Sequence, residues 1–303
     1  MFGFANRTNL IQPTRQIIVR VFVYSSLYLS VAGVAMVYIS CLLHGLPFDP
    51  VAAAILVLVV FAVYNLNRKT DEDEDAINHT ERYAFTKEYE AILFRSAIGA
   101  YVIALCLSAL QGLDSLFVTI VPLVAGIVYS VPLFPAGFGF RRLKEVPLMK
   151  SLVVALSWAV PPALLPVFHA DLSASASTGI AGIFFFFLVF INTVVFDIRD
   201  VEGDLASAVK TLPTILGPQR TLLLLTAVNV TIGAALVLAG GLLLDLYPVL
   251  LLAAGTVYAQ GYLLCFHRLV REKLLFELFA DGQFILLAVI LYLLTLVVPH
   301  LPL

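Results

Sequence analysis

The sequence predicts an all-α membrane protein with roughly nine transmembrane helices, and three observations carry this prediction. Of the 303 residues, 61% are hydrophobic and only 13% are charged, against roughly 45–50% and 25% in soluble globular proteins. Nine stretches of at least 18 residues contain no Asp, Glu, Lys or Arg, and about 20 apolar residues suffice for a helix to cross a bilayer. The apolar stretches do not alternate with polar residues, as the strands of a membrane β-barrel do. The uncharged stretches are 21–48, 50–67, 96–113, 115–140, 151–170, 172–196, 221–244, 246–267 and 282–303.

The first of these stretches is much longer than the apolar core of a signal peptide, so we expect it to be retained as the first span. When crossings are counted from there, all 18 Lys and Arg fall on one side of the membrane. Since cytoplasmic loops are enriched in Lys and Arg, the N-terminus is predicted to be cytoplasmic, in a multi-pass protein of the cell (plasma) membrane. Residues 1–303 then form one polytopic domain. The loops on the opposite side carry Asp49, Asp114, Asp171 and Asp245 and no Lys or Arg.

The second span runs directly into a polar segment in which Asn67, Asp71 and Asp75 are spaced four residues apart. If the helix continues past the bilayer, these three side chains, the first acidic cluster, share one of its faces. Carboxylates and other hard oxygen ligands suit Mg²⁺, which proteins hold with one or two carboxylates plus substrate phosphates. The alternative is an acidic loop that is simply solvated.

The sixth span ends in the same way, with Asp197, Asp200 and Asp204 at spacings of three and four. All three, the second acidic cluster, are expected on one helix face that is turned toward the first cluster. The two clusters lie at equivalent ends of spans that are four crossings apart. This indicates two four-helix-like repeats plus one further helix, arranged as a bundle around a central cavity with the site between the halves. We expect the catalytic loops to be cytoplasmic and to lie near 67–90, 133–150 and 197–220.

Basic residues accompany both clusters on the cytoplasmic side. Carboxylates that hold Mg²⁺, with Arg and Lys around them, would cradle a diphosphate. The alternative for each basic residue is the topological enrichment of cytoplasmic loops. A net charge of −2 gives no basic excess for binding nucleic acid, so no such partner is expected. The basic residues in question are Arg82, Arg141, Arg142, Lys144, Lys150 and Lys210.

Three segments resemble the UbiA-type intramembrane prenyltransferases. Asn67-x3-Asp71-x3-Asp75, followed by Asn78 and Arg82, is similar to the first aspartate-rich motif of that family. Asp197-Ile-Arg-Asp200-Val-Glu-Gly-Asp204, with Lys210-Thr-Leu-Pro downstream, resembles the second. Between them, Tyr129-Ser130-Val131-Pro132, Arg142-Leu143-Lys144 and Pro147-Leu148-Met149-Lys150-Ser151 are similar to the central loop of the family. The resemblance covers about residues 60–220.

The resemblance implies an enzyme, a Mg²⁺-dependent prenyltransferase of isoprenoid and lipid biosynthesis. It would move a polyprenyl group from an isoprenyl diphosphate, with geranylgeranyl diphosphate as the expected donor, to a lipophilic acceptor within the membrane lipid. An aromatic quinone precursor, a glycerol-phosphate lipid and another isoprenoid remain open as acceptors, because the first span lacks the Arg-Pro pair associated with aromatic acids. Gln12-Pro13-Thr14-Arg15 stands there instead.

The resemblance also assigns roles to individual residues. Asp71, Asp200 and Tyr129 would be catalytic, with Tyr129 near the ionising carbon. The two acidic clusters would each hold one metal ion, through Asn67, Asp71, Asp75, Asp197, Asp200 and Asp204. Contacts to the diphosphate would come from Asn67, Arg82, Lys144 and Lys210. Ser130 and Asn192 are expected to line the cavity, since a polar side chain within a span should face the bundle interior.

Two other functions fit parts of the pattern. A secondary transporter also has repeats and acidic residues, but it usually places them near the bilayer midplane and on helices broken by Gly or Pro. Here the carboxylates lie at the ends of the spans. A relative that uses another diphosphate donor is the second alternative, and the acidic clusters alone do not distinguish it.

Overall fold

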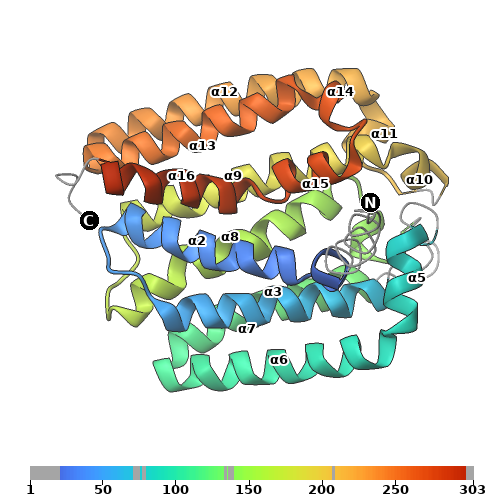
Figure 1. Ribbon diagram of the computed structural model, residues 1–303, viewed down its shortest axis with the longest axis horizontal. Helices are drawn as coiled ribbons and strands as arrows, with labels where there is room; N and C mark the ends of the chain where they lie inside the picture. Colours follow the sequence, from blue (N-terminus) through green and yellow to red (C-terminus); the bar gives the residue numbers. More distant parts are fainter. Residues whose placement is uncertain are drawn as a thin grey trace, which may run out of the picture.

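A computed structural model of the chain describes residues 21–70, 76, 80–132, 135, 140–206 and 209–297. Eight of its helices are long and apolar enough to cross a membrane, and they run side by side along the bundle (Figure 1). These helices are α2 (Leu27–His44), α3 (Pro50–Thr70), α6 (Glu90–Gln111), α7 (Leu113–Ser130), α8 (Met149–His169), α9 (Ala176–Arg199), α12 (Pro218–Leu243) and α13 (Leu246–Leu264).

A ninth apolar helix, α16, is described over Gln283–Val297, and residues 298–303 of the predicted stretch 282–303 lie outside the described residues. It packs against α2 and α13 and so brings the last helix of the chain next to the first span. The described part of the chain has no β-strand, only one isolated bridge between Pro132 and Arg142. The all-α class is therefore confirmed, and eight helices meet the length expected of a span.

Consecutive helices pack against each other, as α2 does on α3, α3 on α6, α8 on α9 and α12 on α13. The core between them consists of aliphatic and aromatic side chains such as Met36, Ile55, Leu165 and Phe184, each 2% exposed or less. Where helices approach closely, glycine makes room: a Cβ at Gly255 of α13 would lie 2.6 Å from the Phe184 ring of α9.

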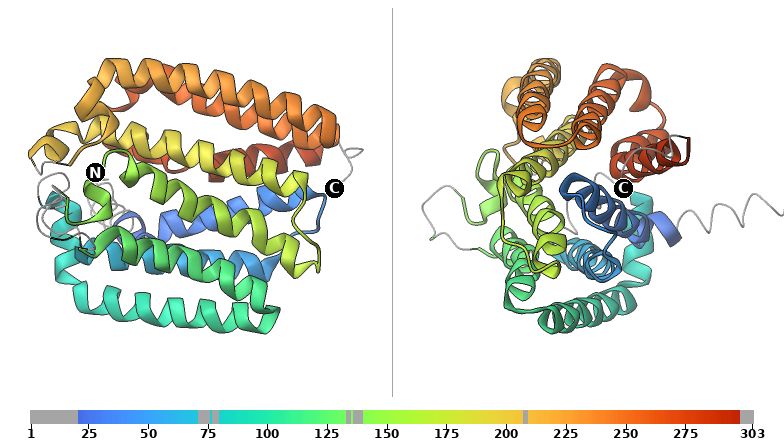
Figure 2. Two further views of the ribbon diagram at one scale, coloured as in Figure 1. Left: turned by 180° about the vertical axis from the view of Figure 1, so that it is seen from behind. Right: turned by 90° about the vertical axis from the view of Figure 1, so that its left-hand side faces the viewer.

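The short helices gather at one end of the bundle, which we call the site end (Figures 1 and 2). They break the chain where the sequence turns from apolar to polar, just beyond the ends of the long helices. These short elements are α5 (Thr80–Glu88), η1 (Leu143–Glu145), α10 (Val201–Ala206), α11 (Leu212–Leu216), α14 (Phe266–Leu269) and α15 (Lys273–Ala280).

The opposite end, the far end, is tied by a chain of hydrogen bonds between three turns. Asp49 Oδ2 lies 2.7 Å from His169 Nδ1, and His169 Nε2 lies 2.9 Å from Ser115 Oγ. The other oxygen of Asp49 accepts from the backbone amides of Val51 and Ala52, so that Asp49 also caps the start of α3. These contacts join α3, α7 and α8. Ser115 is only 1% exposed, so we interpret the contacts as structural.

Candidate active site at the ends of four helices

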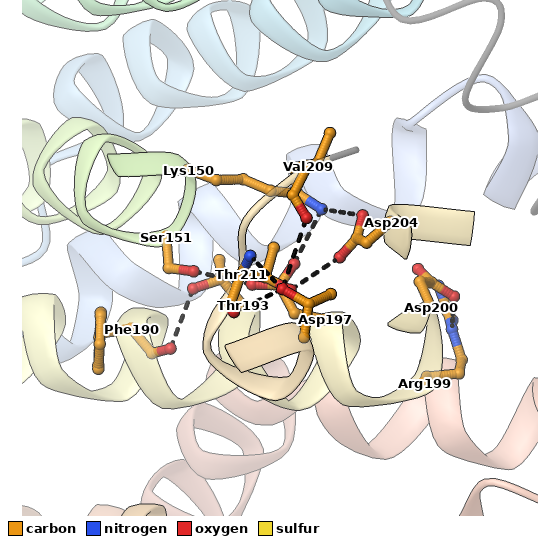
Figure 3. A network of polar contacts seen from close by, with 11 residues as sticks. Lys150, Ser151, Phe190, Thr193, Asp197, Arg199, Asp200, Asp204, Val209 and Thr211 are labelled. Atoms are coloured by element: carbon orange, nitrogen blue, oxygen red, sulfur yellow. Dashed lines mark hydrogen bonds and ion pairs between the residues drawn. The ribbon is translucent and has the colours of Figure 1, made fainter. Parts of the chain in front are cut away.

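The candidate site lies at the site end, where α3, α7, α8 and α9 meet the short elements (Figure 1). Its centre is Lys150, in the first turn of α8. The Lys150 Nζ lies 2.9 Å from Asp197 Oδ1 and 3.1 Å from Asp204 Oδ1 (Figure 3). Asp197 belongs to the last turns of α9, and Asp204 to α10. One ammonium group thus joins two carboxylates from consecutive helices.

Both carboxylates are buried, with side chains that are only 4% exposed. A buried carboxylate must be paired and hydrogen-bonded, because its desolvation is otherwise costly. The neutral partners come from hydroxyl groups: Ser151 Oγ donates to Asp197 Oδ2 at 2.9 Å, and Thr211 Oγ1 to Asp204 Oδ2 at 3.2 Å (Figure 3). Each acid therefore keeps one oxygen turned toward the shared cation and the other bound to a hydroxyl.

Tyr129 and Lys144 lie beside this cluster. Tyr129, in the last turn of α7, is 7% exposed, and Lys144 in η1 is 1% exposed. The Lys144 Nζ lies 6.0 Å from the centre of the Tyr129 ring, and Tyr129 is close enough to Lys150 to interact with its charge. The bridge between Pro132 and Arg142 returns the chain from α7 to η1. Lys144 thus lies beside a buried aromatic ring that is also within electrostatic range of Lys150.

Asn67 connects α3 to the same region. A Cβ placed at Gly126 of α7 would lie 3.5 Å from Asn67 Oδ1, so the side-chain oxygen of Asn67 faces the backbone of α7. Tyr129 follows Gly126 by three residues, about one helical turn. The first residue of the first acidic cluster therefore lies one turn from Tyr129. Asp71 and Asp75 fall outside the described residues.

The Asp200 carboxylate contacts a different cation from the carboxylates of Asp197 and Asp204. Helix α9 ends at Arg199, and Asp200 leaves the helical path with φ −96° and ψ 13°. Its carboxylate is held by Arg199, with Nε 2.7 Å from Oδ1 and Nη2 2.8 Å from Oδ2 (Figure 3). The three acids expected on one helix face thus form two groups, one around Lys150 and one around Arg199.

The C-terminal helices supply further acids near Arg199. Arg199 Nη1 lies 3.8 Å from Glu277 Oε1 of α15. Asp281 follows α15 and interacts with the charges of Glu277, Arg199, Arg82 and Asp200. Burial, and secondly the Glu277 carboxylate, raise the pKa of Asp281 to about 7 against the opposing effect of the two arginines. Arg82 of α5 thus lies close enough to Asp281 for their charges to interact.

The remaining predicted residues have simpler surroundings. Asn192 is buried and donates from Nδ2 to the Ala280 carbonyl at 2.7 Å, which joins α9 to α15. The Lys210 Nζ lies 5.9 Å from the centre of the Phe140 ring. Ser130 is the last residue of α7 and is half-buried.

Sequence reasoning left four charged residues of this site unassigned. Lys150 belongs to the central loop, but the family resemblance indicates Lys144 as the contact to the diphosphate. Arg199 lies inside the second motif, between Asp197 and Asp200, and only the two acids were predicted to be functional. Glu277 and Asp281 are spaced four residues apart just before the last apolar stretch. That spacing repeats the pattern of the acidic clusters and is the signal that could have identified them.

The carboxylate oxygens of the site are ligands of the kind that hard divalent cations prefer. No group of three or more His, Cys, Asp or Glu side chains converges among the described residues, which exclude Asp71 and Asp75. Yet Asp197 and Asp204 already direct oxygens at a single positive group, the Lys150 ammonium. Carboxylate oxygens placed in this way fit a Mg²⁺ ion that is completed by substrate phosphates.

Solved structures share the fold at low sequence identity. A UbiA homolog from Aeropyrum pernix K1 superposes with a TM-score of 0.67 and 16% identity, over 90% of this chain and 98% of that one. A UbiA homolog from Archaeoglobus fulgidus, bound to GPP and Mg²⁺, gives 0.59 and 17% with the same coverage. A structure described as a digeranylgeranylglyceryl phosphate synthase gives 0.55 and 15%, over 90% and 99%.

No curated protein sequence matches the chain. The model of the UbiA prenyltransferase family does match it, over residues 31–280. This match runs from α2 to the end of α15 and includes both acidic clusters, Tyr129 and the two lysines beside it. With a family match over most of its length and the fold of UbiA homologs, the chain belongs to the UbiA prenyltransferase family and is a membrane prenyltransferase.

Proposed function

We propose that the protein transfers a polyprenyl group from an isoprenyl diphosphate to a lipophilic acceptor, with the reaction centred between Lys150, Tyr129 and the two acidic clusters. The observation that carries this proposal is the pair of buried carboxylates, Asp197 and Asp204, that meet one ammonium group at 2.9 and 3.1 Å. Such a pair can exchange its cation for a metal ion while the lysine moves to a phosphate oxygen.

The metal-binding residues follow from the two clusters. Asn67, Asp71 and Asp75 would hold one Mg²⁺, and Asp204 and Asp200, with Asp197, a second. When bound, the metal ions would neutralise the negative charge that develops on the departing diphosphate.

The basic residues would bind the diphosphate itself. Lys144 lies beside Tyr129, which is also within electrostatic range of Lys150, and Lys210 follows α10 and precedes α11. Arg82 would approach from α5. Each of these groups would interact more strongly with the departing diphosphate, which gains one negative charge as the C–O bond breaks, than with the bound donor, and this difference is what lowers the barrier.

Tyr129 and the apolar walls would then control the allylic cation. An aromatic face stabilises a cation within about 6 Å of its centroid, and the Tyr129 ring is buried beside two basic groups that anchor the diphosphate. Buried apolar side chains of α2, α3 and α9 exclude water, which would otherwise capture the cation.

We assign geranylgeranyl diphosphate as the donor. A glycerol-phosphate lipid, an aromatic quinone precursor and another isoprenoid are the acceptor classes to be tested. One structural neighbour is named for digeranylgeranylglyceryl phosphate synthesis, and another was solved with GPP and Mg²⁺. A long apolar donor also suits a site at the end of a bundle whose outer faces are apolar.

We further propose nine spans, with α16 as the ninth and the N-terminus in the cytoplasm of the cell membrane. The two repeats would be α2, α3, α6 and α7, and α8, α9, α12 and α13. In support, the Lys and Arg of the described residues lie at or near the ends of the long helices on the site end, which would then be cytoplasmic, in keeping with the preference of Lys and Arg for that side.

The direct test is release of diphosphate from geranylgeranyl diphosphate by the protein in lipid nanodiscs, with a membrane lipid extract as the source of acceptor. Release should require Mg²⁺, stop with chelator and fall at least a hundredfold in Asp204→Asn, by analogy with loss of one charge-stabilising group. Glu202→Gln is the matched control, because Glu202 is exposed on the same short helix. Metal-independent release, or equal loss in both variants, would contradict the proposal.

A further inference from the structure

We propose that Arg199 is a positioning residue that competes with the metal ion for Asp200, and that Glu277 receives its guanidinium when the metal binds. This inference rests on the proposed function, since it concerns the metal affinity of the same site. It assigns a role to the α15 segment, whose Glu277 follows Arg199 by 78 residues in the sequence.

The guanidinium of Arg199 is confined between α9 and α15. Its central carbon lies 4.6 Å from the centre of the Phe196 ring and 5.5 Å from that of Phe276. The two rings meet edge to face, with centroids 4.9 Å apart. The Arg199 side chain is 14% exposed. Contacts with the aromatic rings stabilise the cation without directional hydrogen bonds.

Two carboxylates compete for this confined cation. Asp200 holds it now, with both of its oxygens, at 2.7 and 2.8 Å. Glu277 lies at 3.8 Å from Nη1, beyond hydrogen-bond length but within reach of a small rotation. Asp281 follows in the same segment, close enough to interact with the charges of both Glu277 and Arg199, but its raised pKa of about 7 leaves it only partly ionised near neutral pH. The guanidinium can therefore exchange Asp200 for Glu277 and remain paired throughout.

The receiving segment is held firmly in place. The last carbonyl groups of α15 accept side-chain hydrogen bonds from three separate helices: Leu278 from Tyr28 of α2 at 3.1 Å, Phe279 from Tyr258 of α13 at 2.8 Å, and Ala280 from Asn192 of α9 at 2.7 Å. Such bonds satisfy carbonyls that a helix end leaves without intrahelical partners. Glu277 and Asp281 thus belong to a fixed frame, and Arg199 is the group that moves.

This competition predicts opposite effects on metal affinity. A carboxylate whose two oxygens are bound to a guanidinium must release at least one of them before it can bind a metal ion. Removing Arg199 should therefore tighten metal binding. Removing Glu277 should weaken it, because Arg199 then has one partner fewer and stays on Asp200. A purely structural role for either residue would weaken binding in both variants.

The probe is Mn²⁺, titrated alone onto the full-length protein in nanodiscs and followed by the electron paramagnetic resonance signal of the free ion. We expect Arg199→Gln to bind Mn²⁺ about tenfold more tightly, a change that corresponds to roughly 1.4 kcal/mol. Glu277→Gln should bind it several-fold more weakly. Arg220→Gln and Glu272→Gln are the matched controls, because both residues are exposed at the same end of the bundle and change the net charge equally.

The dependence on partners separates competition from general electrostatics. In an Asp200→Asn background, Arg199→Gln should no longer tighten Mn²⁺ binding, and in an Arg199→Gln background Glu277→Gln should have no effect, as a double-mutant cycle measures directly. Equal, finite affinities in the wild type and Arg199→Gln would overturn this inference alone. Absence of Mn²⁺ binding in both would count against the metal site of the proposed function as well.

Discussion

Replacing Lys150 with methionine tests the centre of the site most directly, because the change keeps the length of the side chain and removes its charge. Lys150 contacts Asp197 at 2.9 Å and Asp204 at 3.1 Å, and both acids are 4% exposed. At about 3 Å and an effective dielectric constant of about 20, each contact contributes about 5–6 kcal/mol of Coulomb energy before desolvation. Breaking a buried pair by removing one partner typically costs about 3–5 kcal/mol. We expect Lys150→Met to lose stability of that order in chelator.

The same variant should regain stability with Mg²⁺, because the two carboxylates then lack a competing ammonium group. A ligand that binds only the folded state at about 100 times its dissociation constant adds about 2.7 kcal/mol. The assay is thermal unfolding in detergent, in chelator and across a Mg²⁺ titration. Lys87→Met is the control: Lys87 pairs with Glu90 at 3.1 Å, but the two side chains are 48% and 31% exposed, and such pairs contribute about 0–1 kcal/mol.

The reasoning would be refuted if Lys150→Met and Lys87→Met had the same melting temperature in chelator, since the stability of the buried acids would then not depend on the ammonium group. A large loss that Mg²⁺ did not reduce would refute the second step, because the vacated carboxylates would not be holding the ion. Activity alone could not separate these outcomes, as loss of a diphosphate contact and loss of folding both lower turnover.

Other changes give separate tests of the two ends of the bundle. Asp71→Asn and Asp200→Asn should each abolish diphosphate release while expression stays near that of the wild type, and Glu72→Gln should be nearly silent; a Glu72 effect as large as that of Asp71 would show that the assumed helix face is wrong. At the far end, Asp49→Asn should cost about 1.5–3 kcal/mol by weakening its hydrogen bond with His169. Burial raises the pKa of Asp49, but His169 and the first backbone amides of α3 outweigh it and hold the pKa below its usual value. The stabilisation is therefore complete above the ordinary carboxyl pKa of about 3.9 and lost as the pH falls through the lowered value, so acid should narrow the difference in melting temperature between wild type and Asp49→Asn.

The eight long helices could be predicted from the sequence because one requirement, the apolar thickness of a bilayer, sets their length. The same requirement put the polar residues at the ends of the spans and so located the site end. The last apolar stretch shows the limit of this reasoning. Its uncharged run begins at 282, and the helix begins at Gln283 as that run suggests. A separate helix, α15, precedes it, however, and the break between the two helices is stabilised by hydrogen bonds from other helices. An uncharged run does not reveal such a break.

The pairing of acidic with basic residues in the site could not be predicted, because it depends on where a helix ends. Spacings of three and four place Asp197, Asp200 and Asp204 on one face only while the helix continues. Helix α9 stops at Arg199, so Asp200 turns to a different cation. Likewise, Lys144 and Lys150 are both basic residues of one loop, and the family resemblance favours Lys144. Packing of α8 on α9 is what brings Lys150 to the two acids, and no local pattern encodes that packing.

The described acids of the site share one property that bears on how substrates enter. The two groups around Asp197 and Asp200 are each paired with one basic residue, Lys150 and Arg199 respectively. A metal ion that arrives alone at Asp197 and Asp204 must displace the Lys150 ammonium group, which then needs a new partner. A metal ion that arrives with the donor diphosphate brings that partner, since the carboxylates can take the metal while Lys150 binds a phosphate oxygen. On the proposed function, the built-in ion pairs therefore favour binding of metal and donor together over binding of the metal alone.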